Sequence, residues 1–151
     1  MIRRAFVFDA NELTKMWDAM HKEVSHRESI LEEYNNLTVL FINLVKRIES
    51  PDWCVAVYEV DEQIAGFFMG RIKWPEYNHC HVIGECEAIY VKPEYRGHNI
   101  HCKLIEECVN WAKANKATQF EFSGPYDETM IRFWDKLGYE PVTISYRQKE
   151  D

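Results

Sequence analysis

The stretch from Ile83 to Ile105, IGECEAIYVKPEYRGHNIHCKLI, constrains the fold more than any other part of this chain. Its first half has the period of two that is typical of a β-strand, in which alternate side chains lie on opposite faces. The residues that this period places on one face are Glu85, Glu87, Ile89 and Val91. Tyr90 falls on the other face by the same parity. Pro93 then ends the strand, because proline has no N–H to donate to a sheet.

The second half of the same stretch predicts a helix. Its apolar residues recur at helical spacing, in the order Ile100, Leu104, Cys108 and Trp111. The helix is predicted to begin directly after a basic turn at Arg96 and Gly97. The first N–H groups of a helix have no partner within it, and the helix dipole adds positive potential there. A strand, a basic turn and a helix start therefore indicate an anion site, above all for a phosphate.

These residues resemble the acyl-CoA binding motif of the GNAT superfamily of N-acetyltransferases. That motif is Arg or Gln, two variable residues, Gly, one variable residue, then Gly or Ala, and here it falls on Arg96-Gly97-His98-Asn99-Ile100-His101. Asn99 and His101 stand at the two small positions. Asparagine is the residue next most tolerant of the left-handed conformation after glycine, so we expect Asn99 to keep the turn, whereas the His101 side chain occupies space that a phosphate would use. The resemblance implies that acetyl-CoA is bound by Ile89, Tyr90, Val91, Arg96, Gly97, His98, Asn99, Ile100 and His101.

A second stretch, DETMIRFWDKLGYEPV, resembles the closing helix of the same family, Asn-x-x-Ala-x-x-aliphatic-Tyr-x-x-x-Gly-Phe. Asp127 stands at the Asn position and Trp134 at the Tyr, and the resemblance implies that both contact the cofactor. In the family that Tyr often protonates the departing CoA thiolate, which Trp134 cannot do without a hydroxyl. The remaining proton donors are Tyr139, Tyr126 and water.

Transfer of an acyl group from a thioester to an amine needs a base near the amine. Glu85 matches by position the strand glutamate that some GNAT members use as a base, and Glu87 shares its predicted face. Two carboxylates on one face are expected to raise each other's pKa, which suits a base that works near neutral pH. The alternative for each is a solvated sheet residue or an ion-pair partner. The nearby histidines and cysteines lack zinc spacing, so we expect no metal site.

Composition narrows the class of protein. The chain has 151 residues, which we expect to form one domain over 1–151, and a formal net charge of −7. This charge argues against nucleic acid or an anionic membrane as a partner and favours a cationic substrate such as an amine. No apolar run approaches the length of a membrane span, and the start MIRRAF is unlike a signal peptide. Five cysteines without framework spacing indicate a reducing compartment, so we expect a cytoplasmic protein. Strand edges, which often pair between chains, favour a homodimer.

The remaining chain supplies the other elements of the fold. Strands are predicted at residues 2–8, 53–60, 64–73, 79–91, 118–122 and 139–147. The first predicted helix is capped by Asp9, with Glu12 three residues on, and runs to about residue 24. Further helices are predicted from about residue 29 to 48, from the basic turn at Arg96 and Gly97 to about residue 115, and over 128–137. This order predicts an α/β fold with a mixed, mainly antiparallel sheet and helices on both faces. GNAT proteins show the same order, so the resemblance covers nearly the whole chain.

Three functions remain open from the sequence. The first is an N-acetyltransferase that moves an acetyl group from acetyl-CoA to a primary amine of a small molecule or peptide, with residues 28–34 and 74–78 near the acceptor. The second is a GNAT-fold protein without catalysis that serves as a binding or structural subunit, which the missing small residues and the missing Tyr favour. The third is a different α/β enzyme that binds another phosphate-bearing ligand at the same helix end.

Overall fold

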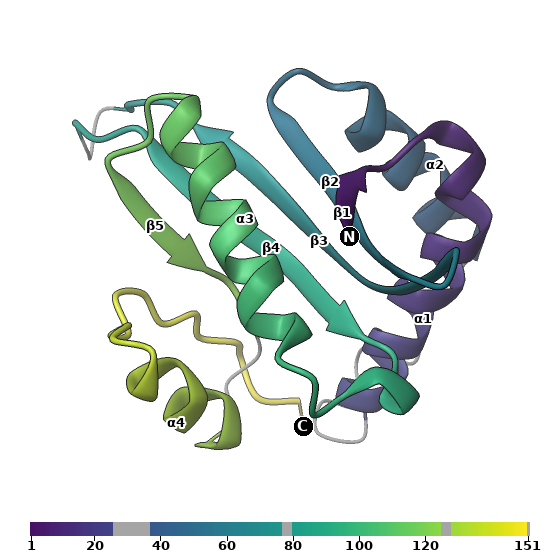
Figure 1. Ribbon diagram of the computed structural model, residues 1–151. Helices are drawn as coiled ribbons and strands as arrows, with labels where there is room; N and C mark the ends of the chain where they lie inside the picture. The colour runs from purple at the N-terminus through teal and green to yellow at the C-terminus, as the bar shows by residue number, and fades with distance from the viewer. Residues whose placement is uncertain (26–36, 77–79, 125–127, 151) are drawn as a thin grey trace.

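A five-stranded sheet forms the centre of the protein (Figure 1). The computed structural model describes residues 1–25, 37–76, 80–124 and 128–150. The sheet has the order β1-β2-β3-β4-β5, and its strands are β1 (Ile2–Arg4), β2 (Trp53–Val60), β3 (Gln63–Lys73), β4 (Ile83–Val91) and β5 (Gln119–Phe122). Neighbouring strands are antiparallel except β4 and β5, which run parallel. The predicted mixed, mainly antiparallel sheet is therefore confirmed.

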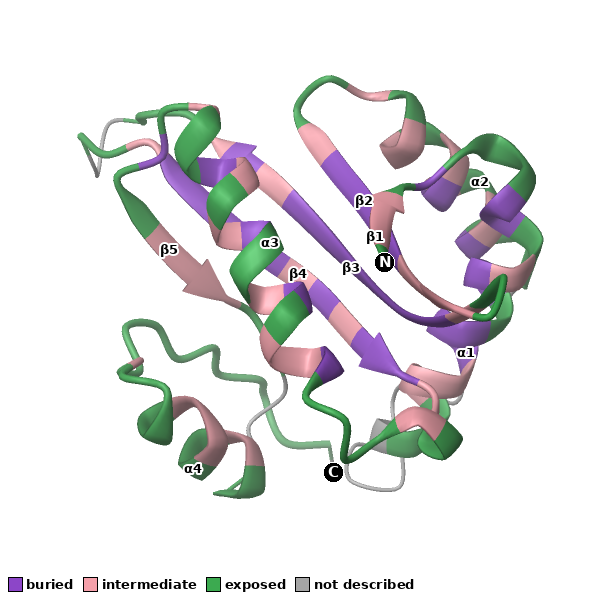
Figure 2. Cartoon of the chain, viewed as in Figure 1, coloured by how far each residue is buried: buried purple, intermediate pink, exposed green. Residues whose placement is uncertain are grey.

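Helices cover both faces of this sheet, as the sequence predicts. In Figure 1, α3 (Ile100–Ala114) crosses one face, while α1 (Ala10–Ser25) and α2 (Leu37–Glu49) lie on the other. The short helix α4 (Glu128–Lys136) follows β5, and two 3-10 turns, η1 (Val7–Asp9) and η3 (Pro93–Tyr95), precede α1 and α3. Buried residues follow β2, β3 and β4 between these layers (Figure 2). The predicted second helix begins in residues 26–36, which lie outside the described residues.

Helix α3 lies close to the sheet because two strand residues have no side chain. A Cβ atom on Gly84 would collide with the Cβ of Ala112, and one on Gly70 would lie 3.0 Å from Cys108 Sγ. The buried stripe of α3 is Ile100, Leu104, Cys108 and Ala112. This close contact fixes the height of the helix over the sheet and thereby the position of its N-terminus.

A β-bulge in β4 changes which side chains share a face. Met69 pairs with Ala88 and Gly70 pairs with Cys86, so Glu87 is the extra residue. Beyond a bulge the alternation of side chains is reversed. Tyr90 therefore packs on the face of α1 and α2, as Glu87 does, while Ile89 and Val91 pack against α3. The predicted parity is wrong for Tyr90, Ile89 and Val91, because it assumed an unbroken strand.

The C-terminal segment differs from the prediction. Residues 139–150 form no strand, and in the described chain no backbone hydrogen bond joins 140–150 to the sheet. The alternating Val142, Ile144 and Tyr146 are 69%, 62% and 91% exposed. A strand needs a partner as well as a pattern, and Pro141 removes one backbone donor from this segment. The helix before it does end as predicted, with Gly138 at a φ of 86°.

Two element starts also differ from the sequence prediction. The strand predicted over residues 2–8 ends at Arg4, and the chain then turns, leaving Val7 46% exposed. Asp9 is buried, but it holds the turn rather than α1: it accepts hydrogen bonds from the Phe6 backbone N–H (2.7 Å) and from Arg3. The predicted box with Glu12 is not formed, because Glu12 pairs with Lys92 instead. β4 begins at Ile83, later than predicted.

Candidate active site

β4 and β5 separate beside the N-terminus of α3, and this opening defines the candidate site. The two strands pair only from Ile83 with Gln119 to Cys86 with Phe122. Among the described residues β4 pairs only with β3 from Glu87 onward, because β5 ends at Phe122, and in Figure 1 β4 runs on past the end of β5 with its other edge open. The bulge at Glu87 therefore lies where the separation begins. An open strand edge offers backbone N–H and C=O groups to an extended ligand.

The turn between β4 and α3 has the shape of an anion site. Gly97 has a φ of 85° and Asn99 a φ of 63°, so two residues of the turn are left-handed, and the prediction for Asn99 is confirmed. A Cβ on Gly97 would meet nothing within 4 Å, so this turn is open to a ligand. The backbone N–H groups that begin at Ile100 have no acceptor within the helix and share its dipole. A phosphate fits such a turn.

Arg96 supports this turn from the side of α1. Its Nε donates to the Val91 carbonyl (2.9 Å), and its Nη2 lies 2.9 Å from Glu23 Oε2. Tyr90 completes the arrangement, because its hydroxyl donates to Glu23 Oε1 (2.9 Å) and its ring lies below the Arg96 guanidinium. Burial, together with the bond to Glu23, raises the pKa of Tyr90 to about 12. The side chains of Arg96 and Tyr90 therefore hold the turn; sequence reasoning missed Glu23, which no motif marks.

The two histidines of the motif have different surroundings. His98 is exposed, and its Nδ1 lies 3.1 Å from the Arg96 carbonyl oxygen. His101 is half-buried, with its ring edge-on to Phe133 of α4 (6.3 Å between centroids). Burial lowers the pKa of His101, and the charge of Arg96 adds to this effect. A neutral His101 beside the turn can donate one hydrogen bond to a phosphate without adding a positive charge.

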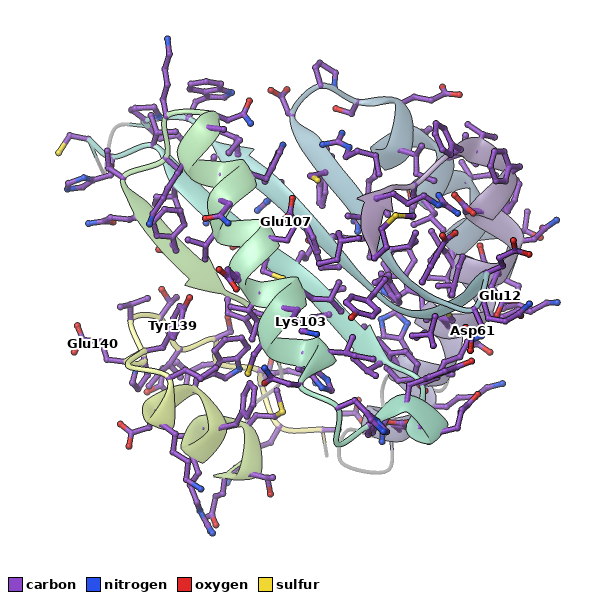
Figure 3. The ribbon with its side chains drawn as sticks, viewed as in Figure 1. Glu12, Asp61, Lys103, Glu107, Tyr139 and Glu140 are labelled. Carbon is purple, nitrogen blue, oxygen red and sulfur yellow. The ribbon has the colours of Figure 1, made fainter. Side chains whose placement is uncertain are left out.

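An aromatic cluster lines the α3 side of β5. Trp134 packs on Phe122 (3.9 Å between centroids) and edge-on to Tyr139 (5.1 Å). Trp134 and Tyr139, with Cys86 and Cys108, border a small cavity of about 20 Å³ between α3, β5 and α4. Figure 3 shows Tyr139 just after α4, while the neighbouring Glu140 points into solvent. Burial raises the pKa of Tyr139, so its phenol stays protonated and able to donate. Asp127 and Tyr126 lie outside the described residues.

Glu85 lies on the opposite face of the sheet and is fully engaged. It accepts hydrogen bonds from Arg71 Nε (3.0 Å), Lys73 Nζ (3.2 Å) and Ser123 Oγ (3.1 Å), with a side chain only 7% exposed. Burial alone would raise the pKa of Glu85, but the charges of Arg71 and Lys73 outweigh it and lower the pKa. The expectation that neighbouring carboxylates raise this pKa is therefore wrong for Glu85.

Glu87 is the more available carboxylate on that face. Its side chain is 32% exposed, and its Oε2 lies 2.7 Å from Arg47 Nη1 of α2. Although this oxygen is buried, its contact with Arg47 lacks hydrogen-bond geometry, and it has no other partner among the described residues. Glu85 and Glu87 do share a face, as predicted, because the bulge comes only at Glu87. Sequence reasoning missed Arg47, because the sequence predicts a helix there but does not show that this helix contacts β4.

Comparison with known proteins agrees with this geometry. The sequence matches the Acetyltransferase (GNAT) family over residues 11–139. No curated protein sequence is detectably similar to it. Similar solved structures include the BH1408 protein from Bacillus halodurans in a tetramutant form (TM-score 0.82, 18% identity, 99% of each chain covered). A possible acetyltransferase from Clostridium difficile 630 has a TM-score of 0.80 at 17% identity, covering 100% of this chain and 97% of the other. The aminoglycoside N-acetyltransferase AAC(6')-Iy, in complex with CoA, has a TM-score of 0.74 at 16% identity, covering 99% and 94%.

The chain therefore belongs to the GNAT family of acetyltransferases. The TM-scores show that the similar structures share its fold, and at these low identities the likeness is one of fold alone. None of the helices in the described ranges combines the length and apolar character that crossing a bilayer requires. Across the same ranges, no three His, Cys, Asp or Glu side chains gather as metal ligands would.

Proposed function

We propose that this protein transfers an acetyl group from acetyl-CoA to a primary amine of a small molecule or peptide. One observation carries the proposal: the left-handed turn at Gly97 and Asn99 opens onto the gap where β4 leaves β5, and Glu87 lies at that same point. A phosphate-binding turn, an open strand edge and an available carboxylate are thereby brought together. These are the three parts that acyl transfer from CoA to an amine uses.

The cofactor is assigned to the α3 side of this gap. The pyrophosphate would bind the N–H groups at the start of α3, with His98 and His101 beside it. The pantetheine would extend along the open edge of β4 near Ile89 and Val91, and Trp134 would pack at its side. When bound, acetyl-CoA supplies the activated acetyl group.

Glu87 is assigned as the base in preference to Glu85. In the reaction the amine nitrogen forms a bond to the acetyl carbon, and the carbon–sulfur bond of the thioester breaks. The amine proton passes to Glu87, and the CoA thiolate takes a proton from Tyr139 or from water. Glu85 is buried among two cations and a hydroxyl, and its lowered pKa makes it a poor proton acceptor.

The alternative is a GNAT-fold protein without catalysis, which acts as a binding or structural subunit. Two observations support this alternative. The side chain of Arg96 forms an ion pair with Glu23. His101 stands where the family motif has a small residue, and Trp134 stands where it has a Tyr. For either function a cytoplasmic location is proposed, because none of the five cysteines is paired.

Release of free CoA, followed with a thiol reagent over a panel of amines, tests the proposal. Glu87→Gln should lower kcat about a hundredfold, because a positioned base contributes about 10²–10⁴-fold, with little change in acetyl-CoA affinity. Glu121→Gln is the matched control, since Glu121 lies on the same face and, among the described residues, its side chain forms an ion pair with Lys73 alone (3.5 Å). Tight acetyl-CoA binding with no CoA release for any amine would favour the non-catalytic alternative.

A further inference from the structure

The face that carries Glu87 also holds an arginine stacked between two tryptophans. The guanidinium carbon of Arg47 lies 4.2 Å from the ring centroid of Trp53 and 4.9 Å from that of Trp17. Its side chain is only 20% exposed. Stacking on aromatic faces fixes the plane of an arginine and leaves its edge, with the N–H donors, free to bind. Arg47 therefore presents an oriented edge beside Glu87.

A second arginine lies on the same tryptophan. The guanidinium carbon of Arg71 is 5.8 Å from the Trp53 centroid, and its side chain is 38% exposed. Of the Arg71 guanidinium nitrogens, Nε donates a hydrogen bond to Glu85. Within the described residues its two terminal nitrogens form no hydrogen bond, and the same is true of Nη2 and Nε of Arg47. Arg47 and Arg71, which both lie beside Trp53, therefore each have N–H donors that can bind a ligand.

The positive charges of Arg47 and Arg71 lie close together and repel each other. Burial lowers the pKa of Arg47, the ion pair with Glu87 opposes this, and the charge of Arg71 lowers the pKa further. The repulsion between two half-desolvated cations is relieved when an anion binds both. Guanidinium edges match carboxylates in geometry, because both groups are planar and can form two parallel hydrogen bonds. The protein has a net charge of −7, so two neighbouring arginines mark a local positive site that suits an acidic group.

We propose that the acetyl acceptor is a short amino acid or a related amine that carries a carboxylate, which Arg71 and Arg47 bind while the amine faces Glu87. The inference rests on the proposed function and names its substrate class. Arg71 pairs across the strands with Glu85, two residues before Glu87, or about 7 Å along β4. An acceptor of a few bonds between its amine and its acid group spans this separation. The net charge favours a cationic acceptor such as an amine, and at this face the proposal adds a carboxylate to that amine, which makes the acceptor zwitterionic.

Matched pairs of acceptors test the inference. Glycine, β-alanine and γ-aminobutyrate are each compared with their primary amides, which keep the amine and the shape but lack the negative charge. We expect kcat/KM for the preferred acid to exceed that for its amide by about tenfold to a hundredfold, which is the range that charge-assisted hydrogen bonds give. Arg71→Gln should bring this ratio close to one. Arg132→Gln, which changes a 76% exposed arginine on α4, should leave the ratio and the turnover unchanged.

A binding measurement separates this inference from the proposed function. The acetylated products, such as N-acetyl-β-alanine and its amide, are titrated into the protein by calorimetry. Preferred binding of the acids without turnover of any amine would support the carboxylate site and contradict the transferase proposal. Turnover of amines with no preference for acids would overturn the inference and leave the transferase intact. If Arg71→Gln does not fold, Arg71→Lys replaces it, because lysine keeps the charge but loses the paired donors and should reduce the ratio.

Discussion

Replacing Glu85 by glutamine tests whether this carboxylate anchors the sheet or acts as the base. Glutamine keeps the size of the side chain but loses its charge, so the bonds from Arg71 and Lys73 are no longer charge-assisted. Hydrogen bonds to charged groups contribute about 1.5–3 kcal/mol, and breaking a buried ion pair costs about 3–5 kcal/mol. Arg71 and Lys73 are 38% and 31% exposed, so water recovers part of the loss. We therefore expect Glu85→Gln to lower the free energy of unfolding by about 2 kcal/mol at neutral pH.

The pH dependence of this effect has a definite sign. The folded protein lowers the pKa of Glu85 below its ordinary value of 4.5. A carboxylate of this kind stabilises the fold fully above the unfolded pKa, and its contribution is lost as the pH falls through the folded pKa. The difference in stability between the wild type and Glu85→Gln should therefore be constant near neutrality and shrink as the pH is lowered below 4.5.

Urea denaturation at neutral and acidic pH measures both quantities. Glu121→Gln is the control, because Glu121 is 27% exposed and its one ion pair within the described ranges is a 3.5 Å contact with Lys73. This substitution should cost less than about 0.5 kcal/mol. A Glu85→Gln protein as stable as the control, or a difference that does not change with pH, would refute the anchoring role. Glu85 would then return as a candidate base beside Glu87.

Substitutions at four further positions test the geometry of the site. Gly84→Ala should destabilise the fold by about 1–3 kcal/mol in urea denaturation, because the new Cβ collides with Ala112 and moves α3; unchanged stability would contradict the close packing. Asn99→Gly should keep acetyl-CoA affinity within about twofold, whereas Asn99→Val should weaken it about tenfold in calorimetry, since a β-branched residue resists a φ of 63°. Arg96→Ala should weaken acetyl-CoA binding several-fold, and Glu23→Gln should do the same, because each releases the turn from α1; an unchanged affinity in both variants would count against this role.

The central sheet and its helices were predictable because their signals are local. Alternation defined the hairpin of β2 and β3. Helical spacing defined α3 and most of its buried stripe, in which Ala112 takes the place predicted for Trp111. The left-handed Asn99 was also predictable, since residue type alone limits which conformations are easy. These features depend on neighbours in the sequence.

The details of the site depended on contacts that no local pattern records. The bulge at Glu87 shifts the register between β3 and β4, and it reverses the faces of Ile89, Tyr90 and Val91. The pKa of Glu85 is set by cations on β3, a different strand. Residues 139–147 alternate as a strand does, yet they stay outside the sheet, because pairing with an edge is a tertiary event.

Calorimetric titration of the purified protein with acetyl-CoA tests the central claim most directly, with ATP and desulfo-CoA as comparison ligands. The account predicts saturable binding of one acetyl-CoA per chain with a dissociation constant below about 100 μM, or about −5.5 kcal/mol. Desulfo-CoA should bind similarly, since it keeps the pyrophosphate and the pantetheine, and ATP should bind more weakly. An absence of binding at millimolar acetyl-CoA would contradict both the cofactor assignment and the acetyltransferase proposal.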